Sequence, residues 1–180
     1  MNNTLKQIGI KFGGVATILL VLTYLFFYLV NYKLMNSVIS GFIIIFILIV
    51  FGILATFIAK RKLGGYLTFK EAFIPYFLTV AISVLASTVF LFVLYGVIDT
   101  ETATLLKENA IALTQQQMTN FGVPADQASK SVEMVSESNP YSFGSLFMSA
   151  ATRILMLCIP GLITALAFRN KSEFTLPKES

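Results

Sequence analysis

The sequence predicts an all-α integral membrane protein: a four-helix bundle with a short two-helix extracytoplasmic segment between its third and fourth helices. Three observations support this fold class. Charged residues make up only 12% of the 180 residues, about half the share found in soluble domains. Four stretches are apolar and long enough to cross a hydrocarbon core of about 30 Å. A single sizeable polar segment, residues 99–141, separates two of them.

The predicted spanning helices cover about residues 12–32, 34–59, 72–98 and 143–168. A spanning helix needs about 20 mostly apolar residues, and the only charge within these stretches is Arg153 in the fourth. The first stretch exceeds the length of a signal-peptide core and lacks an A-x-A-like cleavage site, so we expect it to be retained. The first two stretches are separated by one residue, which predicts a tight hairpin at Lys33. We expect a single membrane domain over residues 1–180.

Local motifs predict several helix ends. Thr68-Phe69-Lys70-Glu71 fits a capping box, in which Thr68 caps the helix and Glu71 reaches back to it. Asn139-Pro140 places an N-cap residue before a proline, which is typical of a helix start, here that of the fourth span. Pro75 and Pro160-Gly161 lie within spans and predict kinks.

The distribution of cations predicts the orientation. Four spans place the N-terminus, the second loop and the C-terminus on one side of the membrane. That side holds nine cations: Lys6, Lys11, Lys60, Arg61, Lys62, Lys70, Arg169, Lys171 and Lys178. The opposite side holds three: Lys33, Lys107 and Lys130. Because cytoplasmic loops carry an excess of Lys and Arg, we expect both termini in the cytoplasm.

The polar segment 99–141 predicts two short helices lying over the outer mouth of the bundle. Asp99 is a good N-cap residue, and helix-spaced apolar residues follow it until Gly122-Val123-Pro124 breaks the chain. A second run carries Ala125, Ala128, Val132 and Val135 on one face, which indicates an amphipathic helix. The pair is either a cap that binds a ligand or partner, or a connector that packs on the bundle or the lipid headgroups.

The composition excludes several kinds of chemistry. The chain has no His and one Cys, Cys158, so an internal disulfide, a Cys/His metal site and a Ser-His-Asp or Cys-His nucleophile are impossible. No phosphate-binding loop or dinucleotide fingerprint is present. The net charge of +4 arises from helix ends and does not indicate nucleic-acid binding. We therefore expect no enzymatic activity, no catalytic residues, no cofactor and no metal.

Arg153 is the candidate functional or pairing residue within the spans. A cation at the centre of a spanning helix costs about 2.5–3.5 kcal/mol on insertion scales, so it usually faces the bundle or a wet cavity. The candidate acceptors for its guanidinium are Asp99 and Glu137 near the outer surface, nearby hydroxyls or backbone carbonyls, and headgroup phosphates reached by snorkelling. Its role is either structural pairing or contact with a transported anion.

Small residues in the spans predict close helix packing. Gly9 and Gly13 form a GxxxG pair, and Ser83 and Ser87 lie one turn apart, as in small-xxx-small interfaces. Hydroxyl residues such as Thr79 have the same interpretation. No Asp or Glu lies within a span, which disfavours proton-coupled transport.

Two segments resemble a family of small bacterial membrane proteins, the domain of unknown function family 4199. One is Leu5–Gly13, running into the first span, and the other is Gly64–Phe73, which contains a Phe-Lys-Glu-Ala-Phe box. The Gly122-x-Pro break and the short basic tail are similar too, so the resemblance covers about residues 5–171. It implies a four-helix protein of the Gram-negative inner membrane. It implies no reaction, and no functional residues can be carried over.

The sequence thus favours a multi-pass membrane protein that is a non-enzymatic structural or interaction protein. Its expected partners are the lipid bilayer and either further copies of itself or another membrane protein, with no nucleic acid. The alternative is a small transporter or channel subunit in which Arg153 lines a polar cavity.

Overall fold

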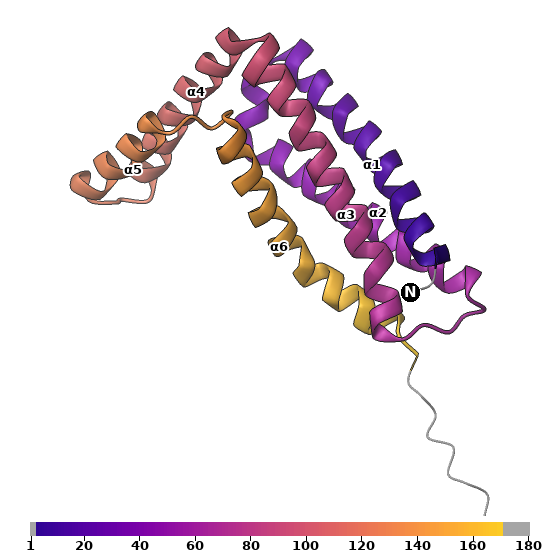
Figure 1. Cartoon of the computed structure of the whole chain (residues 1–180). Helices are drawn as coiled ribbons and strands as arrows, with labels where there is room; N and C mark the ends of the chain where they lie inside the picture. The colour runs from indigo at the N-terminus through magenta and orange to yellow at the C-terminus, as the bar shows by residue number, and fades with distance from the viewer. Residues whose placement is uncertain (1–2, 171–180) are drawn as a thin grey trace, which may run out of the picture.

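A computed structural model describes residues 3–170, and within them the protein is entirely helical (Figure 1). The elements are α1 (Asn3–Val30), the 3₁₀ helix η1 (Tyr32–Asn36), α2 (Val38–Lys62), α3 (Phe69–Leu91), the π-helix η2 (Phe92–Ile98), α4 (Thr100–Asn120), α5 (Ala125–Glu137) and α6 (Phe143–Phe168). Four are long and apolar enough to cross a membrane: α1, α2, α3 with η2, and α6. The prediction of an all-helical protein with four such helices is confirmed. Lys171 and Lys178, two of the cations counted above, lie outside the described residues.

We name the two ends of the bundle by what they carry. The arm end holds η1, η2 and the start of α6, and the α4–α5 hairpin leaves from it (Figure 1). The tail end holds the start of α1, the loop between α2 and α3, and the end of α6. Lys60, Arg61 and Lys62 lie in the last turn of α2 at the tail end.

The helix ends confirm some of the predicted motifs and contradict one. At the capping box, the Glu71 amide donates to Thr68 Oγ1 at 3.3 Å and the Thr68 amide donates to Glu71 Oε2 at 3.0 Å. Asn139-Pro140 does not open the last helix. Asn139 instead accepts a hydrogen bond from the Tyr141 amide in a local turn, and Ser142 caps α6. Asn and Ser both suit N-cap positions, and the chain uses the later one.

The turn between α1 and α2 is longer than predicted. The single-residue hairpin at Lys33 is wrong, because η1 occupies this region and Ser37 caps α2. The Asn31 side chain accepts from the Lys33 amide and so starts the 3₁₀ turn. Helix α1 also begins well before residue 12, since Leu5 is buried against the bundle and holds the first turns in helical register.

Helix α3 is the centre of the bundle, in contact with α1, α2 and α6. Its contact with α1 is close: a Cβ atom at Gly9 would lie 2.7 Å from Leu78 Cβ. Two hydroxyls of α3 also bond to the α1 backbone, Thr79 to the Gly9 carbonyl at 3.3 Å and Ser83 to the Gly13 carbonyl at 3.1 Å. Small residues let two helix backbones approach closely, and hydroxyls of one helix can then donate to backbone carbonyls of the other. The predicted packing role of these residues is confirmed.

Tyr76 of α3 lies between two glycines in the middle of the bundle. A Cβ atom at Gly52 of α2 would lie 2.6 Å from one edge of the Tyr76 ring, and a Cβ at Gly161 of α6 would lie 2.6 Å from the other edge. The ring is 1% exposed. We call these three residues the Tyr76 clamp. It joins α2, α3 and α6, and it gives Gly161 a role besides the predicted Pro160-Gly161 kink.

Helices α4 and α5 pair as a hairpin, which we call the arm, and it projects sideways from the bundle (Figure 1). Only α4 contacts the bundle, through η1 and η2, whereas α5 contacts α4 alone. Two helices were predicted here, and they are present. Their predicted position over the mouth of the bundle holds only for the first turns of α4. The reason is that α5 pairs with α4 and contacts no other described element, so it does not cover the bundle.

Candidate functional site: a pocket at the arm end

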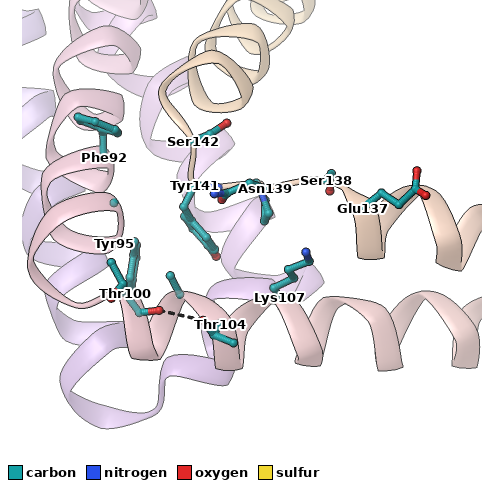
Figure 2. Close-up of a pocket in the computed structure, with 13 residues that line it drawn as sticks. Phe92, Tyr95, Thr100, Thr104, Lys107, Glu137, Ser138, Asn139, Tyr141 and Ser142 are labelled. Carbon is teal, nitrogen blue, oxygen red and sulfur yellow. Dashed lines mark hydrogen bonds between the residues drawn. The ribbon is translucent and has the colours of Figure 1, made fainter.

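A pocket of about 390 Å³ lies where the arm joins the bundle (Figure 2). Three segments form its walls: η2 on one side, the first two turns of α4 below, and the connector 137–142 that leads into α6. The lining mixes aromatic rings with polar groups. Because three separate elements meet here, the shape of the pocket depends on how each is anchored.

The wall formed by η2 is a π-helix. The Asp99 amide donates to the Leu94 carbonyl at 2.8 Å, a bond that spans five residues. Gly96 makes this wall possible, because a Cβ atom there would lie 3.0 Å from the Phe92 ring and 3.3 Å from the Tyr141 carbonyl. Short π-helical segments within α-helices occur frequently at functional sites, which directs attention to this end of α3.

Tyr95 and Tyr141 form the aromatic wall. Their ring centroids are 5.0 Å apart, and the Tyr28 ring packs edge-on against Tyr95 at 6.2 Å. Tyr95 is 1% exposed, and its hydroxyl has no hydrogen-bond partner in the described structure. Burial raises the pKa of Tyr141 to about 12, so its hydroxyl keeps its proton at neutral pH and can donate. Buried polar groups without partners are rare and call for an explanation.

Lys107 supplies the cation of the pocket. Its side chain rises from α4 toward the connector at Asn139 (Figure 2). Among the described residues, its ammonium forms no hydrogen bond or ion pair. Glu137 stands on the rim, and its carboxylate points away from the cavity (Figure 2). The pocket therefore combines a free ammonium with the hydroxyl of Tyr141 and with the polar side chains of Thr100, Thr104, Ser138, Asn139 and Ser142.

Asp99 anchors the base of the arm. Its carboxylate accepts from the Thr102 amide at 2.9 Å as the N-cap of α4 and from the Tyr28 hydroxyl at 2.7 Å. These bonds, first that of the Thr102 amide, hold the pKa of Asp99 below its ordinary value. Asn36 adds a second anchor by donating to the Leu106 carbonyl at 2.8 Å. Asp99 was predicted both as a helix cap and as an acceptor for Arg153, and the structure gives it the first role.

Arg153 lies away from the pocket, on α6. Its guanidinium donates to the Tyr24 hydroxyl of α1 at 3.4 Å. Of the predicted acceptors, a hydroxyl therefore receives this bond, and within residues 3–170 neither Asp99 nor Glu137 does. Arg153 also borders a groove of about 520 Å³ between α2 and α6, whose other lining residues include Ile45, Met156 and Pro160. The lining of this groove is mostly apolar.

Comparison with known protein families matches residues 11–170 to the family described as "Protein of unknown function (DUF4199)". The chain belongs to this family. Comparisons with curated proteins and with solved structures give no match. Membership in DUF4199 confirms the resemblance seen in the sequence. It assigns no activity to any residue.

The arrangement at the arm end is suited to binding. No group of three or more His, Cys, Asp or Glu side chains that could hold a metal occurs within residues 3–170. General acid–base catalysis needs an acid and a base within reach of the same atom, and around the pocket the acids are occupied or turned away. What remains is the ammonium of Lys107, the hydroxyl of Tyr141 and uncharged polar side chains beside aromatic rings.

Sequence reasoning identified Glu137 and Asp99 in this region but missed Tyr95, Lys107, Tyr141 and Gly96 as parts of one site. Tyr95 and Tyr141 lie near the ends of predicted spans, where tyrosines are common. Nothing in the sequence showed that their rings touch. The usable signal was weak. It consisted of a tyrosine and a glycine side by side at the end of a span, followed by a polar helix.

Proposed function

We propose that this DUF4199 protein is a multi-pass protein of the bacterial inner membrane, with both termini in the cytoplasm and the arm outside it. The observation that supports this orientation is the asymmetry of cations in the sequence, nine on the side assigned to the cytoplasm against three on the other. Lys60, Arg61 and Lys62 contribute most, because they follow one another in the last turn of α2, a candidate span.

We also propose that the protein has a non-enzymatic interaction role, and the structure of the arm supports this role. The hairpin reaches beyond the bundle and is tied down at its base by Asp99 and Asn36. It carries five acids and two lysines, unlike helices that lie on anionic membranes, which are rich in Lys and Arg. At its tip, Phe121 is 83% exposed. A protruding, anchored hairpin with an exposed aromatic tip suits contact with a protein, either a second copy or another membrane protein.

The alternative, transport through a cavity lined by Arg153, has less support from the packing. The groove beside Arg153 opens toward the side of the bundle, and its guanidinium is engaged by Tyr24. Below it, the Tyr76 clamp fills the space between α2, α3 and α6. A pathway along the bundle axis would have to open this contact.

Orientation is tested by fusing alkaline phosphatase, which is active only outside the cytoplasm, to the C-terminus or inserting it at Gly122. We expect activity at Gly122 and none at the C-terminus. Replacing Lys60, Arg61 and Lys62 together with Gln should disturb this pattern more than replacing Lys33 with Gln. An active C-terminal fusion would contradict the proposed topology.

The interaction role is tested by affinity purification of the full chain in mild detergent, with the stoichiometry measured. We expect a second copy or a partner protein to co-purify, and Phe121→Ser to lose it. Lys130→Gln on α5 is the matched control and should retain it. A monomer that co-purifies with nothing would argue against an interaction role.

A further inference from the structure

We propose that the pocket at the arm end binds the phosphodiester of one zwitterionic phospholipid, with phosphatidylethanolamine as the probe. The juxtaposition that carries this inference is an unpaired Lys107 ammonium beside a cavity that is also lined by Tyr141 and by Tyr95, whose buried hydroxyl has no hydrogen-bond partner among the described residues. The inference requires the chain to span a bilayer. It does not depend on which end faces outward or on a protein partner.

The position of the pocket places it at the level of lipid headgroups. One wall is η2, the end of a 30-residue candidate span, and another leads into α6, a span of 26 residues. At about 1.5 Å per residue, these helices are about 45 and 39 Å long. The hydrocarbon core is about 30 Å thick, and the bilayer with its headgroups about 40–45 Å. The ends of both helices therefore lie among headgroups, where phosphodiesters are concentrated.

The polar groups of the pocket match one phosphodiester. The single ammonium of Lys107 balances its single negative charge, and charge-assisted hydrogen bonds of this kind are strong. The Tyr141 hydroxyl points into the cavity from the connector (Figure 2). Tyr95 is 1% exposed, so its buried hydroxyl joins these donors only when the wall of the pocket shifts on binding. Lys is well suited to bind phosphate as a point charge.

The surrounding charges select the headgroup. The arm carries more acids than lysines, so a headgroup with a net negative charge would be repelled. Glu137 on the rim contributes to this field. In phosphatidylethanolamine an ammonium accompanies the phosphate, so the net charge is zero while the phosphodiester remains available to Lys107. The aromatic rings of Tyr95 and Tyr141 provide the apolar side that the glycerol backbone of a lipid requires.

The test is a titration of the purified full chain, in non-ionic detergent, with phosphatidylethanolamine, read by native mass spectrometry. We expect one lipid per chain in the wild type and about tenfold weaker retention in Lys107→Gln, because a charged hydrogen-bond partner is lost. Tyr141→Phe should weaken retention about threefold. Lys130→Gln, a lysine of the same arm outside the pocket, is the control and should bind as the wild type does. Melting temperatures of all variants should agree within about 2 °C, since these positions are not core residues.

The source of the phosphodiester is tested by adding glycerophosphoethanolamine, which has the same headgroup without acyl chains. We expect it to compete poorly. Equal binding of the free headgroup would show a site for a soluble phosphate ester and overturn the lipid assignment. Unchanged retention in both Lys107→Gln and Tyr141→Phe would overturn the site itself. Neither result bears on the topology or the protein interaction proposed above.

Discussion

Two tyrosines, Tyr76 of α3 and Tyr95 of η2, share one unusual property and differ in their surroundings. Each is buried to 1% exposure, and each has a hydroxyl without a hydrogen-bond partner in the described structure. Tyr76 is held between Gly52 and Gly161, where no Cβ atom would fit. Tyr95 lines a cavity of about 390 Å³. The same unsatisfied group therefore belongs to a closed contact at one position and to a residue of a cavity wall at the other.

The comparison shows that an unpartnered hydroxyl must be interpreted from its surroundings. At Tyr76 the ring provides the stabilisation, because it makes close contacts with two helices, and the hydroxyl is a cost that those contacts outweigh. Tyr95 belongs to a cavity wall, so a ligand in the pocket lies against this residue and reaches its buried hydroxyl when the wall shifts. The first tyrosine is a packing residue and the second a site residue, although the sequence presents both simply as tyrosines of a spanning helix.

We expect the largest effect on stability from adding a methyl group at either glycine of the Tyr76 clamp. Gly52→Ala and Gly161→Ala should each destabilise the bundle by about 1–3 kcal/mol, because the new methyl would overlap the Tyr76 ring. Thermal unfolding in detergent measures this. Gly41→Ala on α2 and Gly144→Ala on α6 are matched controls, since no atom lies within 4 Å of their Cβ positions. If the clamp and control variants melt alike, the clamp is not a close contact.

A smaller effect is expected at the base of the arm. Asp99→Ala should destabilise the start of α4 by about 1 kcal/mol, the usual value of an N-cap, because the Thr102 amide and the Tyr28 hydroxyl lose their acceptor. Hydrogen exchange of the first α4 amides should increase while amides of α2 remain protected. Protection unchanged in α4 would mean that Asn36 alone holds the arm.

The same carboxylate predicts a pH dependence. Its pKa is lowered in the folded protein from an ordinary value near 3.8. Its contribution to the stability of the start of α4 is therefore complete above that value. It is lost as the pH falls through the lower folded pKa. The protection factors of the α4 amides, which are their exchange rates relative to the intrinsic rates at the same pH, should therefore fall below about pH 4. Asp99→Asn keeps a capping side chain but cannot titrate, so this acid-dependent step should disappear, and its persistence would point to another group.

The smallest effect is expected at Arg153. Its bond to Tyr24 is long, at 3.4 Å, and interhelical hydrogen bonds in membranes average about 0.6 kcal/mol. A double-mutant cycle with Arg153→Leu and Tyr24→Phe should give a coupling of about 0.5 kcal/mol or less. Arg153→Leu should also insert and fold normally, since it removes a costly charge. If a deletion strain has a phenotype and Arg153→Leu folds without restoring function, the transport alternative would gain support.

Much of the fold follows from local sequence, and the site does not. The apolar runs gave the four long helices, and Thr68-Phe69-Lys70-Glu71 gave a correct helix start, because capping involves neighbours in the chain. The start of α1 and the η1 turn were missed because buried contacts of Leu5 and the side chain of Asn31 decide them. The acceptor of Arg153 is 129 residues away in sequence, and no local sequence pattern indicates a contact between such distant residues.

The pocket was missed for the same physical reason. Lys107 was counted only as a charge near the membrane, and Gly161 only as part of a kink. Their roles depend on which side chains stand opposite, in the connector for Lys107 and on α3 for Gly161. Helix periodicity indicates which face of a helix is apolar, but it does not indicate which residue of another helix meets that face.

The most direct test of the account compares Tyr76→Phe with Tyr95→Phe, each of which removes only a hydroxyl. Melting temperatures are measured in detergent with and without added phosphatidylethanolamine. We expect both variants to be as stable as the wild type or slightly more stable without lipid, because each loses an unpartnered polar atom. Added lipid should stabilise the wild type and Tyr76→Phe equally, and Tyr95→Phe less. An equal response to lipid in all three proteins would contradict the claim that Tyr95 belongs to a binding site and Tyr76 to a packing contact.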